Sequence, residues 1–303
     1  MDIRALQRNW DALGRADPLW AIRFDPSKKG NRWDVEEFFR TGEHEVAALM
    51  ASLERLGFAR FTGGLPLGRS GLPDAVVGAS LLSPPDPPPT QRGHALDFGC
   101  GVGRLTQALA AHFGEVEGVD IAPSMIELAN RYNRYGPRCR YHLNERDDLS
   151  SFGAASFDLV YSTLVLQHIE GRYVRRYLGE FLRVLRPGGV AVFDLPSHPS
   201  RTLQGRLRAL LPQAALNAYR RVRYGYQGVM EQHGIRRPEV VALLQANGGT
   251  VLEVADHPTL GPAWQCFRYF VTVSGTVTDT VTDNVTAQSQ ALRAPEPDPD
   301  PGR

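Results

Sequence analysis

A short glycine-rich stretch constrains the fold of this chain more than any other feature. Residues 94–106 read His-Ala-Leu-Asp-Phe-Gly-Cys-Gly-Val-Gly-Arg-Leu-Thr, so an apolar run leads into Gly99, Gly101 and Gly103. Glycines at alternate positions let the backbone turn tightly and approach a ligand closely. The stretch predicts a strand, a tight turn and a helix whose first N–H groups favour a carboxylate or phosphate.

Acidic residues close two of the predicted strands. Asp97 stands two residues before the first glycine, and Asp120 ends a second predicted short strand, 115–120, 17 residues after Gly103. In dinucleotide-binding folds, a carboxylate at about this separation reaches the ribose hydroxyls. The glycines here are spaced G-x-G-x-G and not G-x-G-x-x-G, as in the dinucleotide-binding motif. The fold class must therefore be inferred from the neighbouring segments as well.

Strands and helices alternate along the rest of the chain. Helices are predicted at about 103–112, 123–135, 171–185 and 238–246, and further strands end near Asn144 or span 157–162, 190–195, 250–256 and 264–274. Such alternation is typical of a parallel sheet with helices on both faces. The predicted fold class is therefore α/β, with a Rossmann-like, doubly wound, mostly parallel sheet.

Four segments carry a resemblance to a known family. In order they are LDFGCGVGRLT, GVDIAPSMIELA, SFDLVYSTLVLQHI and FLRVLRPGGVAVFDLPS. Together they resemble the class I S-adenosylmethionine-dependent methyltransferases over roughly residues 93–274. The resemblance implies an antiparallel last strand, S-adenosylmethionine as cofactor and S-adenosylhomocysteine as product.

The resemblance also implies where the methionine end of the cofactor would lie. Backbone N–H groups of the glycine turn would face the methionine carboxylate, and Asp97 would attract the ammonium directly or through water. The residues implied at this end are Asp97, Gly99, Cys100, Gly101, Gly103, Ser162 and Thr163.

The nucleoside end would lie against the second and third strands. Asp120 would accept hydrogen bonds from both ribose hydroxyls, a task that suits one carboxylate. Ile121 would pack on the adenine, and Asn144 would bind the adenine amino edge. Asp147 and Asp148 lie close to Asn144 in sequence, so they are alternatives for that contact.

Methyl transfer is an in-line displacement in which positioning and desolvation can supply most of the acceleration. An oxygen acceptor usually also needs a base. His168, in the loop after the fourth strand, and His233 are the candidates, with Glu231 as a third and proximity alone as the alternative. No metal site is predicted, because the cysteines at 100, 139 and 266 show neither a ligand spacing nor a disulfide framework.

The flanking segments suggest the domain organisation. Residues 1–57 are predicted to form an N-terminal helical layer, either packed on the sheet or acting as a lid, and 58–93 a linker rich in proline and glycine. Residues 94–274 are the predicted methyltransferase domain. Within it, 198–236 reads as a helical insertion, with eight arginines and one acid between positions 200 and 237. Two interpretations of this insertion are open: a cap that binds the acceptor, or surface helices with a solvated face. Residues 275–303 are predicted to be disordered.

Composition narrows the partners. A net charge of +1 argues against nucleic acid or a charged membrane surface as a binding partner. No apolar run approaches the ~18 residues of a membrane span, and the first residues lack the core of a signal peptide, so a cytoplasmic protein is expected. The loop after the fourth strand favours a small-molecule acceptor methylated on O, N or C. The alternatives are a non-catalytic S-adenosylmethionine-binding protein and a nicotinamide-dependent oxidoreductase; nothing indicates an oligomeric state.

Overall fold

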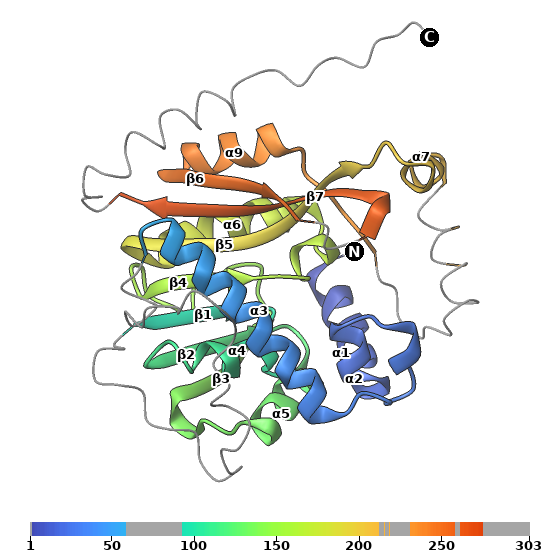
Figure 1. Ribbon diagram of the computed structural model, residues 1–303, viewed down its shortest axis with the longest axis horizontal. Coiled ribbons are helices and arrows are strands. Elements are labelled where there is room, and N and C mark those ends of the chain that lie inside the picture. Colours follow the sequence, from blue (N-terminus) through green and yellow to red (C-terminus); the bar gives the residue numbers. More distant parts are fainter. Residues whose placement is uncertain are drawn as a thin grey trace, which may run out of the picture.

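The computed structural model describes residues 2–58, 93–211, 215, 218, 231–257 and 261–274. Within them, seven strands form one sheet in the order β3-β2-β1-β4-β5-β7-β6 (Figure 1). The strands are β1 (His94–Phe98), β2 (Glu115–Asp120), β3 (Cys139–Leu143), β4 (Phe157–Ser162), β5 (Leu185–Pro199), β6 (Gly249–Asp256) and β7 (Trp264–Val273). β1 to β5 pair in parallel, whereas β7 runs antiparallel to both β5 and β6. The predicted fold class is confirmed.

Helices cover both faces of the sheet, as the alternation predicted. They are α4 (Arg104–Leu109), α5 (Pro123–Tyr132), α6 (Gly171–Val184) and α9 (Arg237–Ala246). The central strands carry apolar side chains on both faces, and Leu96, Val160 and Ala191 have no exposed surface. Because parallel strands are covered on both sides, such continuous apolar runs are what this sheet requires.

Three elements differ in length from their prediction, and one of them is α5, which ends at Tyr132 and not at 135. β5 runs over 15 residues and not only 190–195, because β7 pairs with it antiparallel from Val190 to Pro199. α4 ends at Leu109, short of the predicted 112, because the chain forms a tighter turn there. In this turn the His112 N–H donates to the carbonyl of Leu109, three residues earlier, at 2.8 Å.

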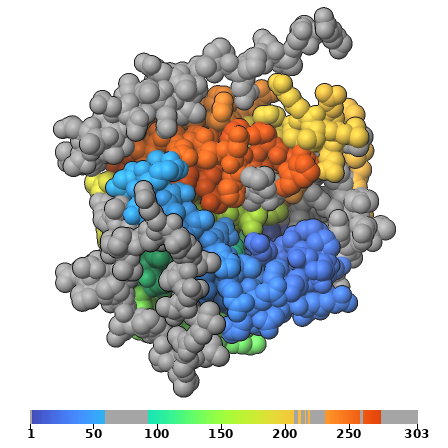
Figure 2. Space-filling model, in the orientation of Figure 1, coloured from blue at the N-terminus to red at the C-terminus, as the bar shows by residue number. Residues whose placement is uncertain are grey.

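Among the described residues, three α-helices precede the sheet in the chain: α1 (Ile3–Ala16), α2 (Pro18–Ile22) and α3 (Val35–Arg55). Asp34 begins α3, since its side chain accepts a hydrogen bond from the Glu37 N–H at 2.8 Å. Figure 1 shows α3 crossing one face of the sheet, while α1 and α2 lie together to one side of it. In Figure 2 this blue layer and the orange β7 region occupy adjoining parts of one face. The N-terminal segment is therefore a helical layer on the domain.

Several predicted segments lie outside the described residues: nearly all of the 58–93 linker, most of 212–230 and the 275–303 tail. Of the predicted insertion, the described part contains the end of β5 and the helix α7 (Leu203–Leu210). No helix in the described ranges is both long enough and apolar enough to cross a membrane.

Candidate functional site

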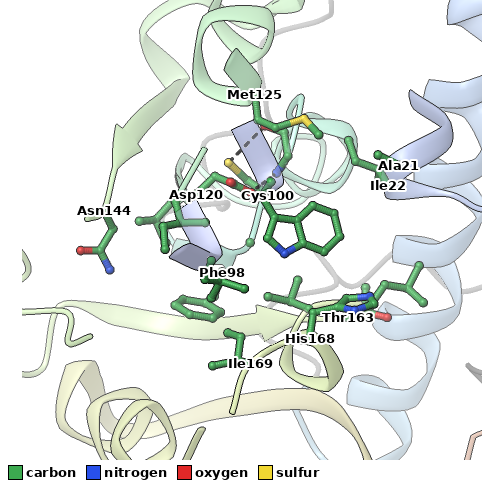
Figure 3. A pocket seen from close by; sticks show the side chains of 18 of the residues that line it. Ala21, Ile22, Phe98, Cys100, Asp120, Met125, Asn144, Thr163, His168 and Ile169 are labelled. Atoms are coloured by element: carbon green, nitrogen blue, oxygen red, sulfur yellow. Dashed lines mark hydrogen bonds between the residues drawn. The ribbon is translucent and has the colours of Figure 1, made fainter. Parts of the chain in front are cut away.

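A cavity opens at the carboxyl ends of the central strands, where open α/β sheets bind their ligands. The space between its walls, including the part open to solvent, amounts to about 900 Å³. The wall comes from the turn after β1, the end of β2, the loop after β4, and helices α1 and α2. Figure 3 shows Asp120 and Cys100 on one side, with Thr163 and His168 across from them.

The glycine turn is built as the sequence predicted. Gly99, Gly101 and Gly103 have φ values of 77°, 53° and 84°, a region that residues with a Cβ rarely adopt. A Cβ on Gly101 would lie 2.5 Å from the Ile22 side chain, and one on Gly99 would lie 2.3 Å from Val165. Gly99, Cys100 and Gly101 line the cavity, whereas Gly103 packs against Tyr141 behind it. The turn therefore lets α2 and the loop after β4 approach the cavity closely.

Asp120 joins the end of β2 to this turn. Its Oδ2 accepts from the Gly101 N–H at 2.9 Å, and its Oδ1 accepts from the Ala122 N–H at 2.9 Å. Burial raises the pKa of this carboxyl above its ordinary value. A carboxylate offers about four lone-pair sites, so both oxygens retain acceptor capacity toward the cavity.

The residues predicted for the adenine lie on the same side as Asp120. Ile121 and Asn144 line the cavity. The Asn144 side chain donates to the Asp148 carbonyl at 2.9 Å. The carboxylates of Asp147 and Asp148 instead pair with Arg176 on α6, at 2.8 and 3.1 Å. Of the three side chains, Asn144 is the one among the cavity-lining residues.

Asp97 and Ser162 lie behind the cavity wall. Asp97 is 1% exposed and accepts a hydrogen bond from the Thr106 hydroxyl at 2.7 Å. Burial raises the pKa of Asp97 to about 7, against the opposing effect of that hydrogen bond. The Ser162 hydroxyl donates to the Phe98 carbonyl at 3.0 Å, whereas Thr163 lines the cavity and donates to Asp194 at 2.6 Å. A direct contact of Asp97 with the methionine ammonium stays a prediction.

The two candidate bases lie near each other in different settings. His168 lines the cavity, with its ring edge-on to Trp10 at 5.0 Å between centroids. Its Nδ1 lies 2.8 Å from the Glu231 carbonyl, which can only accept, so Nδ1 donates and the acceptor lone pair of the neutral ring is on Nε2. His233 is not among the lining residues; its Nε2 lies 3.2 Å from the Glu231 carboxylate.

The cavity also contains residues that the sequence did not single out. Ile3, Leu6 and Trp10 from α1 and Ile22 from α2 form one wall, and Arg104 forms part of another. The helical spacing of Leu6, Trp10 and Leu13 indicates an apolar face on α1, but periodicity does not say what that face covers. Arg104 follows the third glycine directly and gives no local sign of burial.

A second cluster of polar groups lies away from the cavity. His94, Glu115 and Glu117 are close enough to share a metal ion. However, Arg140 Nη2 already lies 2.5 Å from Glu115 Oε2 and 2.7 Å from Glu117 Oε1. Burial raises the pKa of Glu117, but hydrogen bonds from His142, His94 and Arg140 outweigh it and hold the pKa well below its usual range. We assign no metal here, because a guanidinium occupies the cation position between the carboxylates.

The fold and the cavity together define a class of protein. A mostly parallel sheet with an antiparallel β7, a glycine turn after β1 and an acid at the end of β2 are the features of a nucleotide-type cofactor domain. Residues 96–193 match the family model described as a methyltransferase domain. The chain therefore carries a class I S-adenosylmethionine-dependent methyltransferase domain.

Named relatives agree with this assignment. The chain is 37% identical over 116 residues to the O-methyltransferase cnsE of Penicillium expansum, covering 37% of this chain and 41% of that protein. It is 33% identical over 125 residues to the demethylmenaquinone methyltransferase of Tropheryma whipplei, covering 40% and 50%. The chain thus matches half or less of the length of these relatives.

A solved structure shares the fold over most of the chain. It is the magnesium protoporphyrin IX methyltransferase of Synechocystis PCC 6803 with bound S-adenosylhomocysteine. The TM-score is 0.53 at 16% identity, covering 90% of this chain and 100% of that one. At this identity the likeness shows the fold alone.

Proposed function

We propose that this protein transfers a methyl group from S-adenosylmethionine to a small-molecule acceptor. The observation that carries the proposal is the cavity in which Asp120 is hydrogen-bonded to the glycine turn while facing the ligand space. The methyltransferase family match over 96–193 and the small-molecule methyltransferases among the relatives support it.

The residues present fit such a cofactor. Gly99, Cys100 and Gly101 line the cavity, so their backbone can lie against the methionine end. Asp120 has acceptor capacity for the ribose hydroxyls, and Ile121 and Asn144 lie beside it for the adenine. When bound, S-adenosylmethionine supplies a methyl group already activated on a sulfonium.

This chain's own part in the reaction is to orient the acceptor, exclude water and take up a proton where the acceptor loses one. We assign the role of accepting this proton to His168, because its ring lies in the cavity with Nδ1 directed at the Glu231 carbonyl. The N-terminal helices α1 and α2 complete the wall with apolar side chains and thus act as the lid over the cofactor. Relatives named O-methyltransferases favour oxygen as the acceptor atom.

Calorimetric titration with S-adenosylmethionine and S-adenosylhomocysteine tests the cofactor. The wild-type protein should bind both, and Asp120→Asn should weaken both by about 1.5–3 kcal/mol, the usual worth of hydrogen bonds to a charged group. Since Asp120 also holds the glycine turn, thermal unfolding of the variant must be measured in parallel. Unchanged affinity in a folded Asp120→Asn variant would overturn the cofactor assignment.

Turnover is tested separately, by mass spectrometry of phenols, catechols and hydroxyquinones incubated with the protein and S-adenosylmethionine. His168→Asn should lower turnover without changing cofactor affinity. His233→Asn is the comparison, because that ring lies outside the cavity lining. Cofactor binding without turnover of any acceptor would favour the non-catalytic alternative.

A further inference from the structure

Leu164 adopts a backbone conformation that a leucine rarely takes. Its φ is 62°, in the left-handed region, where a bulky side chain strains the backbone. Among the described residues, the other positive φ values outside glycine belong to Asn31 and Ala155, and both of these residues are exposed. Leu164 instead is only partly exposed and lines the cavity proposed to hold the cofactor. The strain therefore lies at the proposed site.

A glycine at this position would relieve the strain, because it adopts a positive φ without steric cost. The chain does use glycine in this way on another wall of the same cavity, where Gly99 and Gly101 have positive φ. Strain that is kept in a protein gathers at functional sites. A leucine in place of a glycine therefore indicates that the Leu164 side chain has a function there.

The residue before Leu164 is held by a buried ion pair. The Thr163 hydroxyl donates to Asp194 Oδ2 at 2.6 Å. The Asp194 carboxylate also accepts two hydrogen bonds from Arg268, at 2.6 Å from Nε and 2.8 Å from Nη2. Asp194 and Arg268 are both buried, so water competes little for these bonds. The start of the loop after β4 is thus fixed to β5 and β7.

The residues after Leu164 are held by packing. Val165 packs against the hydrophobic core, and it lies so close to Gly99 that a Cβ on that glycine would be 2.3 Å from its side chain. The Val165 carbonyl also accepts from the His168 N–H at 2.9 Å. Because both neighbours are held, the backbone of Leu164 has little freedom to relax, which is the condition under which such strain persists.

The position of this loop indicates which part of the cavity Leu164 bounds. Leu164 and the candidate base His168 belong to the same loop, and Figure 3 shows Thr163 and His168 across from Asp120. Since Asp120 marks the proposed ribose side, the loop lies on the acceptor side. The large apolar side chains that line the cavity from α1 and from this loop are Ile3, Leu6, Trp10, Val165 and Ile169. A flat aromatic ring packs well against such a surface.

We propose that Leu164 is a specificity-determining residue, whose strained backbone directs the side chain into the acceptor side of the cavity. There it leaves room for a flat aromatic acceptor, such as a phenol or a catechol, and excludes bulk beside the reacting hydroxyl. The inference rests on the proposed function, since it presumes that the cavity holds S-adenosylmethionine on the Asp120 side.

Calorimetry on protein saturated with S-adenosylhomocysteine tests this selection without turnover. The probes are catechol and 3-isopropylcatechol, which carries a bulky group beside a hydroxyl. The wild-type protein should bind catechol at least about tenfold more tightly, since even one methylene changes the fit to a hydrophobic pocket by that factor. Leu164→Ala should remove most of this preference. Leu243→Ala, which shortens a partly exposed leucine on the core side of α9, should keep it.

Urea unfolding tests the strain itself. Glycine in place of alanine usually lowers stability, but at a left-handed position the order reverses. Leu164→Gly should therefore have a higher urea midpoint than Leu164→Ala, and both variants should bind S-adenosylhomocysteine as the wild type does. A lower midpoint for Leu164→Gly would contradict the inference.

The outcomes separate this inference from the proposed function. A wild-type protein that does not bind S-adenosylhomocysteine overturns the function. If it binds, the role of Leu164 alone is overturned by failure of both catechols to bind, by an unchanged preference in Leu164→Ala, or by weaker S-adenosylhomocysteine binding with unchanged catechol binding. If Leu164→Ala does not fold, Leu164→Gly provides the same test, because it also removes the side chain.

Discussion

Asp97 shows how one residue's setting changes its chemistry. Its carboxyl lies behind the glycine turn, 1% exposed and hydrogen-bonded to Thr106, with Arg104 and Asp120 as its charged neighbours. Burial raises its pKa from 3.8 to about 7. The folded protein therefore keeps the proton over a range in which the unfolded chain has lost it, so stability that is present near pH 4 is lost as the pH rises through 7.

We expect Asp97→Asn to remove this pH dependence, because a neutral amide can still accept the Thr106 hydrogen bond. Urea unfolding of the ligand-free protein measures this effect. Between pH 4 and pH 8, the free energy of unfolding of the variant relative to that of the wild type should rise by at most about 4 kcal/mol. Glu127→Gln, an exposed acid on α5, is the control for removing one carboxylate. Parallel pH profiles for wild type and Asp97→Asn would contradict the prediction.

At the scale of elements, the contact between α3 and α4 depends on a single missing side chain. Gly42 lies inside α3, where an alanine would ordinarily stabilise the helix by up to about 1 kcal/mol. Here the added Cβ would lie 2.6 Å from the backbone oxygen of Arg104, which cannot swing away. The close approach of the two helices therefore requires glycine.

Gly42→Ala should consequently destabilise the protein by about 1–2 kcal/mol in chemical unfolding, because overpacking outweighs the gain in helix propensity. The matched variant is Gly179→Ala inside α6, where the nearest atom to a new Cβ is Asn247 Oδ1 at 3.4 Å. That variant should be neutral or stabilising; equal destabilisation of both would refute the packing argument.

At the scale of the whole molecule, the cavity joins two parts of the chain that are far apart in sequence. Ile3, Trp10 and Ile22 of the N-terminal layer face Asp120 and Thr163 of the sheet domain. A ligand in this space should therefore stabilise both parts together.

At 100 times its dissociation constant, S-adenosylhomocysteine should add about 2.7 kcal/mol to the free energy of unfolding. Hydrogen exchange should show slower exchange in α1 and α2 as well as in the turn after β1. Trp10→Ala should reduce the protection of α1 and weaken binding, because one wall of the cavity is lost. Protection confined to the turn and β2 would mean that the N-terminal layer is not part of the site.

The architecture of the central domain can be predicted from the sequence alone. The patterns that predict it are local. They are apolar runs of strand length, apolar residues at helical spacing along α6, and glycines at positions where the backbone adopts a positive φ. Alternating strands and helices then leave few arrangements besides a parallel sheet. The same local order placed Asp120 and the glycine turn at one edge, because parallel strands end on the same side.

Which side chains face the cavity depends instead on how distant elements of the chain pack together. Asp97 and Ser162 lie near it in sequence but turn behind it, whereas Trp10 and Ile22 come from helices about a hundred residues away. Arg104 is buried because Gly42 allows α3 to pack closely against it. The two residues are 62 positions apart in sequence, so hydrophobic periodicity cannot predict this contact. Local patterns specify the strands and helices, but burial and charge pairing arise only when distant elements pack together.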